Sequence, residues 1–249
     1  MVSQIVLTGM VLSSMPVGEY DKRLVILTAE RGKISAFSRG SRRQNSTMLG
    51  ATEPCVFGKF TLTEGAKSYT LVGADIQKYY MELRTDIESA YVAFYCLEFA
   101  SVTTRENLEA RQILNLLAAT LNALCKKKIP LKLIRRIFEL KMLVLNGEYP
   151  QVFQCIKCGR TEELQDFSTD MLGTVCTCCK KYIRRTLPVM ASTLYALQYV
   201  ISADIDKLYA FTLKEDVCKE FEFIVDYCVR KVLEKPLKSA KMLDLVIEP

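Results

Sequence analysis

The chain has 249 residues, half of them hydrophobic and a quarter charged, with a net charge of +6 and no histidine. Without an imidazole there is no Ser-His or Cys-His catalysis, so we expect no enzyme of those classes. No apolar run approaches the ~20 residues of a membrane span, and residues 1–4 lack the features of a signal peptide, so we expect a cytoplasmic protein with no membrane partner.

Residues 1–75 have the alternation and turn residues of short strands. Strand-like runs cover residues 5–12, 24–28, 34–37, 55–62 and 68–72, and the longest polar gap runs from Gly40 to Pro54. Five short strands within so few residues predict a small closed barrel, most economically an OB-fold. An SH3-like barrel is the alternative.

Beyond residue 85 the apolar residues recur at helical spacing. The pattern predicts helices over 87–100, 113–124, 131–146, 192–201 and 215–234. Gly147 and Pro150 end the third helix, and Ser192 is the predicted N-cap of the fourth.

Two close pairs of cysteines form the strongest chemical signal. Two residues separate Cys155 from Cys158 and Cys176 from Cys179, and 17 residues lie between the pairs. This spacing is typical of a tetrahedral four-cysteine zinc site, whose closed coordination leaves no position for substrate. We therefore expect one structural Zn²⁺ per chain and no catalytic residues, with Cys178 left open as an alternative to Cys179. A redox pair is the other reading.

These patterns together predict an α+β protein: an N-terminal OB-fold β-barrel followed by an α-helical domain with a four-cysteine zinc-binding insertion. We place the nucleic-acid-binding OB-fold domain at residues 1–80 and the helical domain at 81–249. The zinc module is expected at roughly 151–187, where the cysteine pairs interrupt the helical pattern.

The segment from Ser38 to Gln44 leaves a predicted strand and carries three arginines. Guanidinium groups bind phosphate strongly, and basic loops beside an OB-fold sheet form a groove for a single strand. We therefore predict nucleic-acid binding by Arg39, Arg42, Arg43, Lys33 and Ser41. Four aromatic residues are either stacking faces for bases or core residues of the barrel: Phe37, Phe57, Phe60 and Tyr69.

A second basic segment lies near the middle of the chain. Residues 126–141 hold seven Lys or Arg and one acidic residue. The segment is a second nucleic-acid patch, a dock for an acidic peptide tail, or a plain charged surface. Its candidate residues are Lys126, Lys127, Lys128, Lys132, Arg135 and Arg136.

Several segments, in their order and spacing, resemble the bacterial RecO family of recombination mediators. They are TAERGK at 28–33, SAFSRGSRR at 35–43, RIFELKML at 136–143, GEYP at 147–150, CIKCG at 155–159 and KPLKS at 235–239. The resemblance covers nearly the whole chain.

The resemblance implies binding of single- and double-stranded DNA, annealing of complementary strands and loading of a RecA-type recombinase in DNA repair. It also implies a RecR-type partner protein and contact with the acidic tail of the single-strand binding protein. Cys155, Cys158, Cys176 and Cys179 would be the metal ligands. Two alternatives from other classes are an adaptor that binds only an acidic tail and a CxxC thiol-disulfide oxidoreductase.

Overall fold

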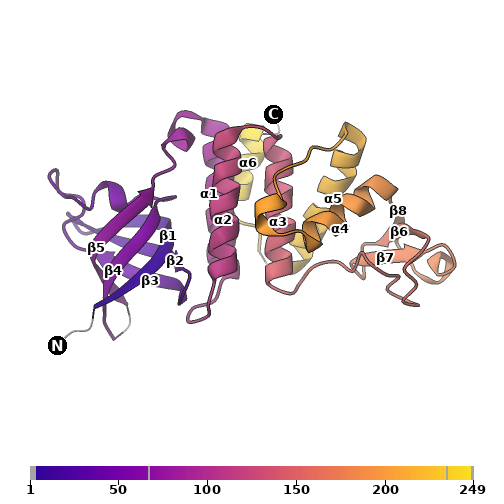
Figure 1. The fold of residues 1–249 in the computed structure, drawn as a ribbon, viewed down its shortest axis with the longest axis horizontal. Helices are drawn as coiled ribbons and strands as arrows, with labels where there is room; N and C mark the ends of the chain where they lie inside the picture. Colours follow the sequence, from indigo (N-terminus) through magenta and orange to yellow (C-terminus); the bar gives the residue numbers. More distant parts are fainter. Residues whose placement is uncertain (1–3, 67, 234, 248–249) are drawn as a thin grey trace. The chain divides into compact units, whose positions relative to one another are not determined.

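The computed structural model describes residues 4–66, 68–233 and 235–247, the last four by their backbone (Figure 1). The chain forms two compact units. One contains the β-barrel with helices α1, α2 and α6, and the other contains α3, α4, α5 and a small sheet. The signal-peptide prediction rested partly on residues 1–3, which lie outside the described residues, as does Glu234, the predicted end of the last long helix.

Five strands close into a barrel. They are β1 (Gln4–Val17), β2 (Asp21–Thr28), β3 (Gly32–Ser38), β4 (Phe57–Glu64) and β5 (Tyr69–Lys78), in the order β1-β2-β3-β5-β4 (Figure 1). Neighbouring strands are antiparallel except β3 and β5, which pair in parallel with Ala36 opposite Tyr69. A five-stranded Greek-key barrel is the OB-fold, so the predicted fold class is confirmed.

The long first strand closes the barrel because it pairs on both edges. Gln4 to Met10 pair with β4, and Gly9 to Val17 pair with β2. The register with β2 shifts between Val11 and Ser13, a bulge that bends the strand. The interior is filled by alternate apolar side chains from all five strands and from the β3–β4 connection, among them Leu7, Val11, Leu24, Ile26, Ile34, Phe60, Leu62 and Leu71.

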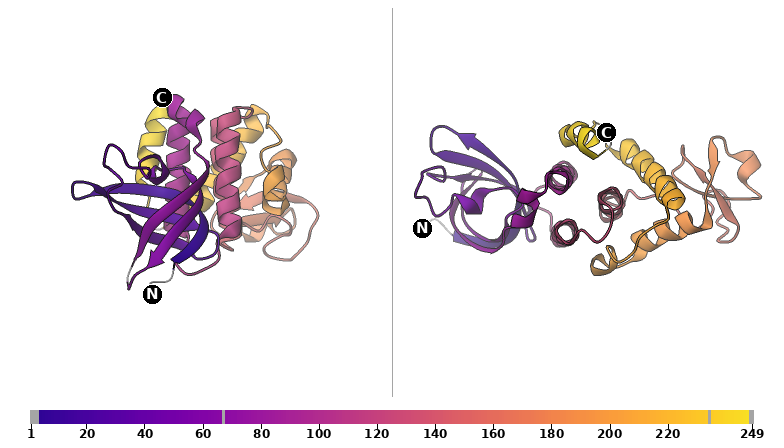
Figure 2. Two further views of the ribbon diagram at one scale, coloured as in Figure 1. Left: turned by 60° about the vertical axis from the view of Figure 1, so that its left-hand side comes forward. Right: turned by 90° about the horizontal axis from the view of Figure 1, so that it is seen from above.

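The helices of the first unit are α1 (Ile87–Thr103), α2 (Arg111–Lys126) and α6 (Lys238–Ile247) (Figure 2). The C-terminal helix α6 is tied to α1 by Glu98, whose carboxylate accepts the backbone N–H groups of Lys238 at 3.0 Å and Ser239 at 2.8 Å. Exposed N–H groups at a helix start need such acceptors. The helical spacing of the sequence did not predict α6.

The second unit contains α3 (Leu131–Leu145), α4 (Ala191–Ser202) and α5 (Glu215–Val232). Its small sheet, in the order β7-β6-β8, consists of β6 (Leu164–Ser168), β7 (Gly173–Cys176) and β8 (Thr186–Pro188). Ser192 lies inside α4 and does not cap it. The backbone N–H of Met190 at this helix start instead donates to Glu220 at 3.0 Å.

The compact units divide the chain differently from the predicted domains, because α1 and α2 belong with the barrel. The domain boundary after residue 80 stays a prediction. Among the helices of the described residues, none combines the length and apolar character that crossing a bilayer requires.

Candidate nucleic-acid interface and metal centre

The arginine loop, residues 38–44 between β3 and β4, holds Arg39, Arg42 and Arg43 at the surface. Gly40 has a φ of +63°, which favours glycine. Its backbone N–H donates to Asp21 Oδ1 at 2.8 Å. The turn therefore attaches the loop to the start of β2 and leaves the arginine side chains outside.

Two of the arginines contact the β1–β2 turn. The Arg42 backbone N–H donates to the carbonyl oxygen of Tyr20 at 2.9 Å, and its guanidinium donates to the carbonyl oxygens of Gly18 and Glu19. The Arg43 guanidinium lies 5.2 Å from the centre of the Tyr20 ring. Sequence reasoning missed Tyr20, because the two loops meet only after β2 pairs with both β1 and β3.

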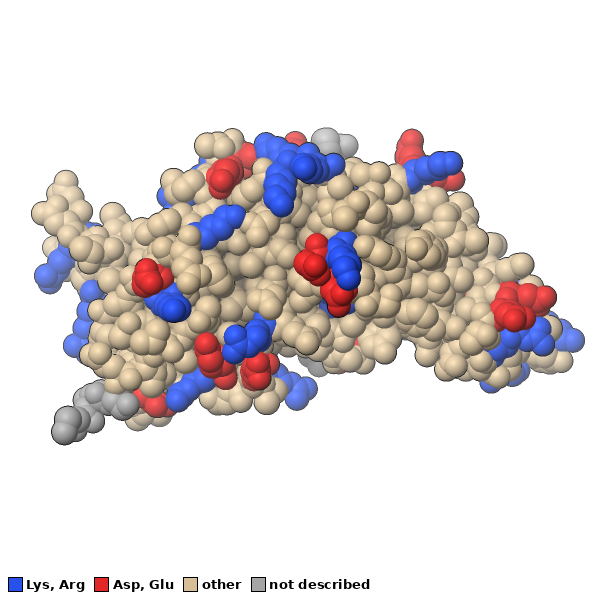
Figure 3. Space-filling model, in the orientation of Figure 1, with Lys and Arg blue, Asp and Glu red and all other residues tan. Residues whose placement is uncertain are grey.

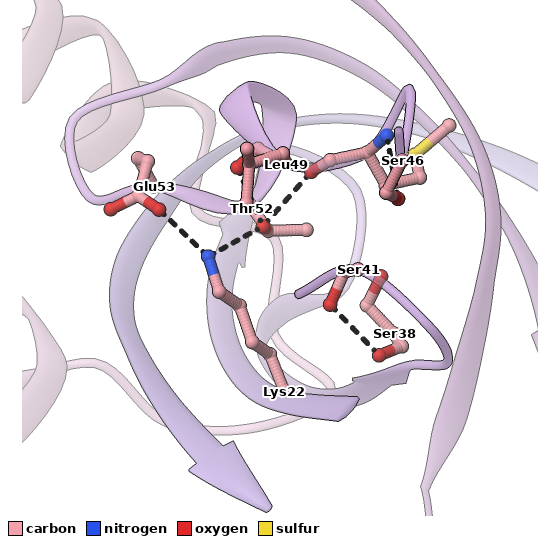
Figure 4. A network of polar contacts seen from close by, with 8 residues as sticks. Lys22, Ser38, Ser41, Ser46, Leu49, Thr52 and Glu53 are labelled. Atoms are coloured by element: carbon pink, nitrogen blue, oxygen red, sulfur yellow. Dashed lines mark hydrogen bonds and ion pairs between the residues drawn. The ribbon is translucent and has the colours of Figure 1, made fainter. Parts of the chain in front are cut away.

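A buried lysine supports the rest of the β3–β4 connection (Figure 4). Lys22 in β2 donates from Nζ to Glu53 at 2.7 Å and to Thr52 Oγ1 at 3.0 Å. Thr52 in turn donates to the carbonyl oxygen of Leu49 at 3.1 Å. A buried ammonium needs such partners, so Lys22 fixes the returning half of the connection to the barrel.

Two of the predicted contact residues have internal partners. Ser41 is buried, and its hydroxyl donates to the carbonyl oxygen of Ser38 at 3.0 Å, as Figure 4 shows. Lys33 donates to the carbonyl oxygen of Ser101 in α1 at 2.6 Å. The structure thus brings together Arg39, Arg42 and Arg43, while Ser41 braces the loop and Lys33 links β3 to α1.

The four aromatic candidates differ in burial. Phe60 is fully buried in the barrel core, which excludes it as a stacking face. Phe37, Phe57 and Tyr69 are half-buried. Tyr69 already accepts a hydrogen bond from Arg31 at 2.8 Å.

The second basic segment does not form one exposed helical face. Lys132 is exposed at the start of α3, whereas Arg136 is buried and Arg135 is half-buried. Both guanidinium groups bind the buried Glu139, Arg135 at 2.9 Å and Arg136 at 2.8 Å. Lys126, Lys127 and Lys128 are exposed at the end of α2 and in the following connection, at the division between the compact units.

Arg136 completes a buried ion-pair network. Its Nη2 lies 3.0 Å from Asp226 of α5. Burial by itself lowers the pKa of Arg136, but Glu139 and Asp226 outweigh that effect and hold the pKa above its ordinary value. Because an unpaired buried charge is costly, Arg136 links α3 to α5 through Asp226, while Arg135 pairs with Glu139 inside α3, and both guanidinium groups are engaged within the protein.

Four cysteine thiols converge in the second unit. The Sγ atoms of Cys155, Cys158, Cys176 and Cys179 all lie within 4.8 Å of one another, with Cys158 and Cys176 3.6 Å apart. A tetrahedron with Zn–S bonds of about 2.3 Å has S···S edges of about 3.8 Å. The residues present therefore fit a four-coordinate thiolate-bound metal ion.

Two tight turns and β7 position these thiols. The Gly159 N–H donates to the carbonyl oxygen of Cys155 at 2.9 Å, and Gly159 has a φ of +73°, as a turn after the second ligand requires. In the second turn the Cys179 N–H donates to the carbonyl oxygen of Cys176, the last residue of β7. The cluster therefore joins two turns that are far apart in the sequence.

The local environment shifts the pKa values of two cysteines of the cluster, Cys155 and Cys179, in opposite directions. Burial raises the pKa of the Cys155 thiol, but hydrogen bonds from the backbone at Cys176, Cys158 and Lys157 outweigh it and lower the value to about 6. Burial and hydrogen bonds with the neighbouring thiols raise the pKa of Cys179 to about 12. The sulfurs thus share hydrogen bonds and interact as one group.

The additional thiol lies outside the cluster. Cys178 is exposed, and Arg160 approaches its sulfur at 3.6 Å. Cys179 is buried with Cys155 and Cys176 beside Leu164 and Val175. Of the two candidates for the fourth ligand, the structure therefore brings Cys179 to the cluster.

Comparisons with known proteins agree along nearly the whole chain. The family model described as "Recombination protein O N terminal" matches residues 1–80, and "Recombination protein O C terminal" matches residues 84–241. Three curated relatives called "DNA repair protein RecO" are similar. The protein of Alkaliphilus metalliredigens is 31% identical, covering 80% of this chain and 82% of its own. The protein of Acetivibrio thermocellus is 29% identical, and that of Clostridium perfringens is 27% identical. Each of these two matches covers 96% of this chain and 97% of the relative. The chain belongs to the RecO family.

Proposed function

We propose that the chain binds single- and double-stranded DNA and anneals complementary strands during DNA repair and homologous recombination. The observation that carries the proposal is the arginine loop, which is exposed and braced by the β1–β2 turn on an OB-fold barrel. Membership of a family whose relatives are called DNA repair proteins supports it. Arg39, Arg42 and Arg43 are the proposed contacts.

The mechanism is electrostatic. Two complementary strands repel each other through their phosphates, and guanidinium groups that neutralise phosphates lower that repulsion. Base pairing then drives annealing, so no nucleotide cofactor is needed, and the chain acts by binding and not as an enzyme. Counterion release makes such binding strongly dependent on salt.

The proposed partners follow from the family. We infer binding to a RecR-type protein and to the acidic tail of the single-strand binding protein, and through them help in loading a RecA-type recombinase. The exposed Lys126, Lys127 and Lys128 offer positive charge for an acidic tail. An adaptor that binds this tail and no DNA is the competing function.

We also propose that Cys155, Cys158, Cys176 and Cys179 hold one structural Zn²⁺ ion. Four thiolates close the coordination shell, so the ion would supply cross-linking and no chemistry. The cysteines would tie the turn at Cys155 and Cys158 to the end of β7. Because the ligands must be assembled by folding, metal affinity would add to the stability of this unit.

Annealing of two complementary oligonucleotides, without nucleotide cofactor, tests the function directly. The wild type should accelerate annealing at low salt and less at moderate salt. Arg39→Gln with Arg43→Gln should weaken binding of a single strand and reduce the slope of log affinity against log salt by about 1.4, since each phosphate contact contributes about 0.7.

The matched control is Arg111→Gln with Arg230→Gln. Both arginines are exposed and ion-paired with carboxylates, and the pair removes the same charge. Equal effects of the two double variants would refute the loop as the contact. Wild-type protein that binds the acidic tail but neither binds nor anneals DNA would replace the proposal with the adaptor.

A further inference from the structure

We propose that the metal module, residues 151–187, carries a separate contact for single-stranded nucleic acid made by Lys157, Lys181 and Tyr182. The inference rests on the proposed function, because it assumes that DNA is the ligand. It adds a surface on the second compact unit, whereas the arginine loop belongs to the first.

Tyr182 brings the two lysines together. Its side chain is 62% exposed. Lys157 Nζ lies 4.0 Å from the centre of the ring, and Lys181 Nζ lies 5.0 Å from it. Two ammonium groups from different turns of the chain therefore both lie close to one exposed aromatic ring.

The cysteine turns fix where these side chains start. Lys157 stands between Cys155 and Cys158, and Tyr182 follows Cys179 closely. The Tyr182 N–H donates to the carbonyl oxygen of Cys179 at 2.9 Å. The cysteine cluster therefore fixes the backbone at Lys157 and Tyr182, and both side chains lie at the surface of the module.

Three other cations of the module have carboxylate partners, and Arg184 is exposed beside them. Arg160 pairs with Glu163 at 3.3 Å, Lys180 with Asp166 at 2.8 Å and Arg185 with Asp170 at 3.4 Å. Within the part of the chain that the structure describes, Lys157 and Lys181 meet the Tyr182 ring and form no ion pair. In Figure 3 blue and red side chains lie side by side over the module, which contains β6, β7 and β8 of Figure 1.

This arrangement suits a single strand better than an acidic peptide. Lys157 and Lys181 place two positive charges beside one exposed ring, and a phosphate bound there is attracted by both. Proteins that bind single strands combine such cations for the phosphates with exposed aromatic faces on which bases stack. An acidic peptide would engage the lysines alone, whereas a single strand would engage the lysines through its phosphates and the ring through a base.

The test compares two double variants of the full-length, zinc-loaded protein. The first combines Lys157→Gln and Lys181→Gln, and the control combines Lys207→Gln and Lys219→Gln. The control lysines lie in the same unit, are exposed and are ion-paired with Asp204 and Glu215. Binding of a single-stranded oligothymidylate is measured across salt concentrations. The first variant should lower affinity and reduce the salt slope by about 1.4, for two lost phosphate contacts, whereas the control should leave both unchanged.

Two variants of the ring separate stacking from charge. Tyr182→Leu should weaken binding and Tyr182→Phe should retain it, because the face and not the hydroxyl stacks. Zinc content and thermal unfolding should stay as in the wild type in all variants.

If the wild type binds DNA with strong salt dependence while the Lys157 and Lys181 variant matches its control, this contact is refuted and the proposed function stands. If the variant loses affinity only for an acidic peptide, the surface is a peptide site and the inference is wrong. If the wild type binds no DNA at all, both proposals fail together.

Discussion

The Arg42 guanidinium donates from Nη1 to the backbone carbonyl oxygen of Glu19 at 3.1 Å. The same nitrogen reaches Gly18, so one edge of the guanidinium clamps the β1–β2 turn. A guanidinium has five N–H donors, and those not used in the clamp remain available for phosphate. Arg42 is therefore a structural brace as well as a proposed DNA contact, whereas the exposed Arg39 is a proposed contact only.

Arg39→Gln and Arg42→Gln should differ in their effect on stability. We expect Arg39→Gln to lower DNA affinity without changing the unfolding free energy beyond about 0.5 kcal/mol, as for most surface changes. Arg42→Gln should lower affinity and also destabilise the fold by about 1 kcal/mol, through lost hydrogen bonds to the turn. Urea unfolding beside DNA titration measures both, and equal unfolding midpoints would contradict the brace.

Arg136→Met should damage stability and leave DNA binding intact. The change removes one of two guanidinium partners of the fully buried Glu139 and leaves Asp226 with Arg230 alone. Removing one partner of a buried ion pair costs about 3–5 kcal/mol, and Arg135 offsets part of that loss by staying bound to Glu139. We expect a destabilisation of about 3 kcal/mol in urea unfolding.

The control for Arg136 is Lys132→Gln, one turn earlier on the same helix and exposed. It should change the unfolding free energy by no more than about 0.5 kcal/mol. A loss of DNA affinity in folded Arg136→Met protein, measured well below its unfolding temperature, would instead restore the residue to the second basic patch.

The barrel was predictable because its strands show the period of two that a filled interior imposes. Alternation at residues 34–37 and 55–62 places Ile34, Ala36, Phe60 and Leu62 inside, as the structure has them. The small sheet at β6, β7 and β8 was not predicted. Its strands are short, and the cysteine turns rather than the strand sequence determine where they pair.

The cysteine cluster was predictable because the spacing of the cysteines is a local property of the sequence. The network around Arg136 was not, since the helical spacing of Lys132, Arg135 and Arg136 fits an exposed face and a buried face equally well. Burial depends on which neighbour covers the helix, here α5 with Asp226. Tyr20 and Lys22 escaped prediction for the same reason, because their partners lie in the separate β3–β4 connection.

Cys158→Ala and Cys178→Ala form a matched pair, because both thiols are exposed and only Cys158 belongs to the cluster. We expect Cys178→Ala to retain one zinc per chain and the wild-type melting temperature. Cys158→Ala should lose the zinc and melt earlier, because the metal contributes to folding. Elemental analysis and thermal unfolding check both variants. Zinc retained by Cys158→Ala and lost by Cys178→Ala would reverse the ligand assignment.

Glu98→Gln should loosen the C-terminal helix in a manner that depends on pH. Burial raises the pKa of Glu98, but hydrogen bonds from Ser239 and Lys238 outweigh it and lower the pKa below its ordinary value. A carboxyl group with a lowered pKa in the folded protein stabilises the fold when ionised, and that stability disappears as pH falls through the folded-state pKa. We therefore expect Glu98→Gln to cost about 1–2 kcal/mol at neutral pH and progressively less in acid.

The comparison residue for Glu98 is Glu215. A hydrogen bond from Lys219 also lowers the pKa of Glu215, but this carboxylate is fully exposed. Glu215→Gln should leave stability nearly unchanged at every pH, because solvent screens exposed pairs. Hydrogen exchange at the Ser239 amide localises the effect to the start of α6, because this N–H donates its hydrogen bond directly to the Glu98 carboxylate. If Glu98→Gln destabilised the protein equally at neutral and acidic pH, the ionised carboxylate would not be what anchors α6 to α1.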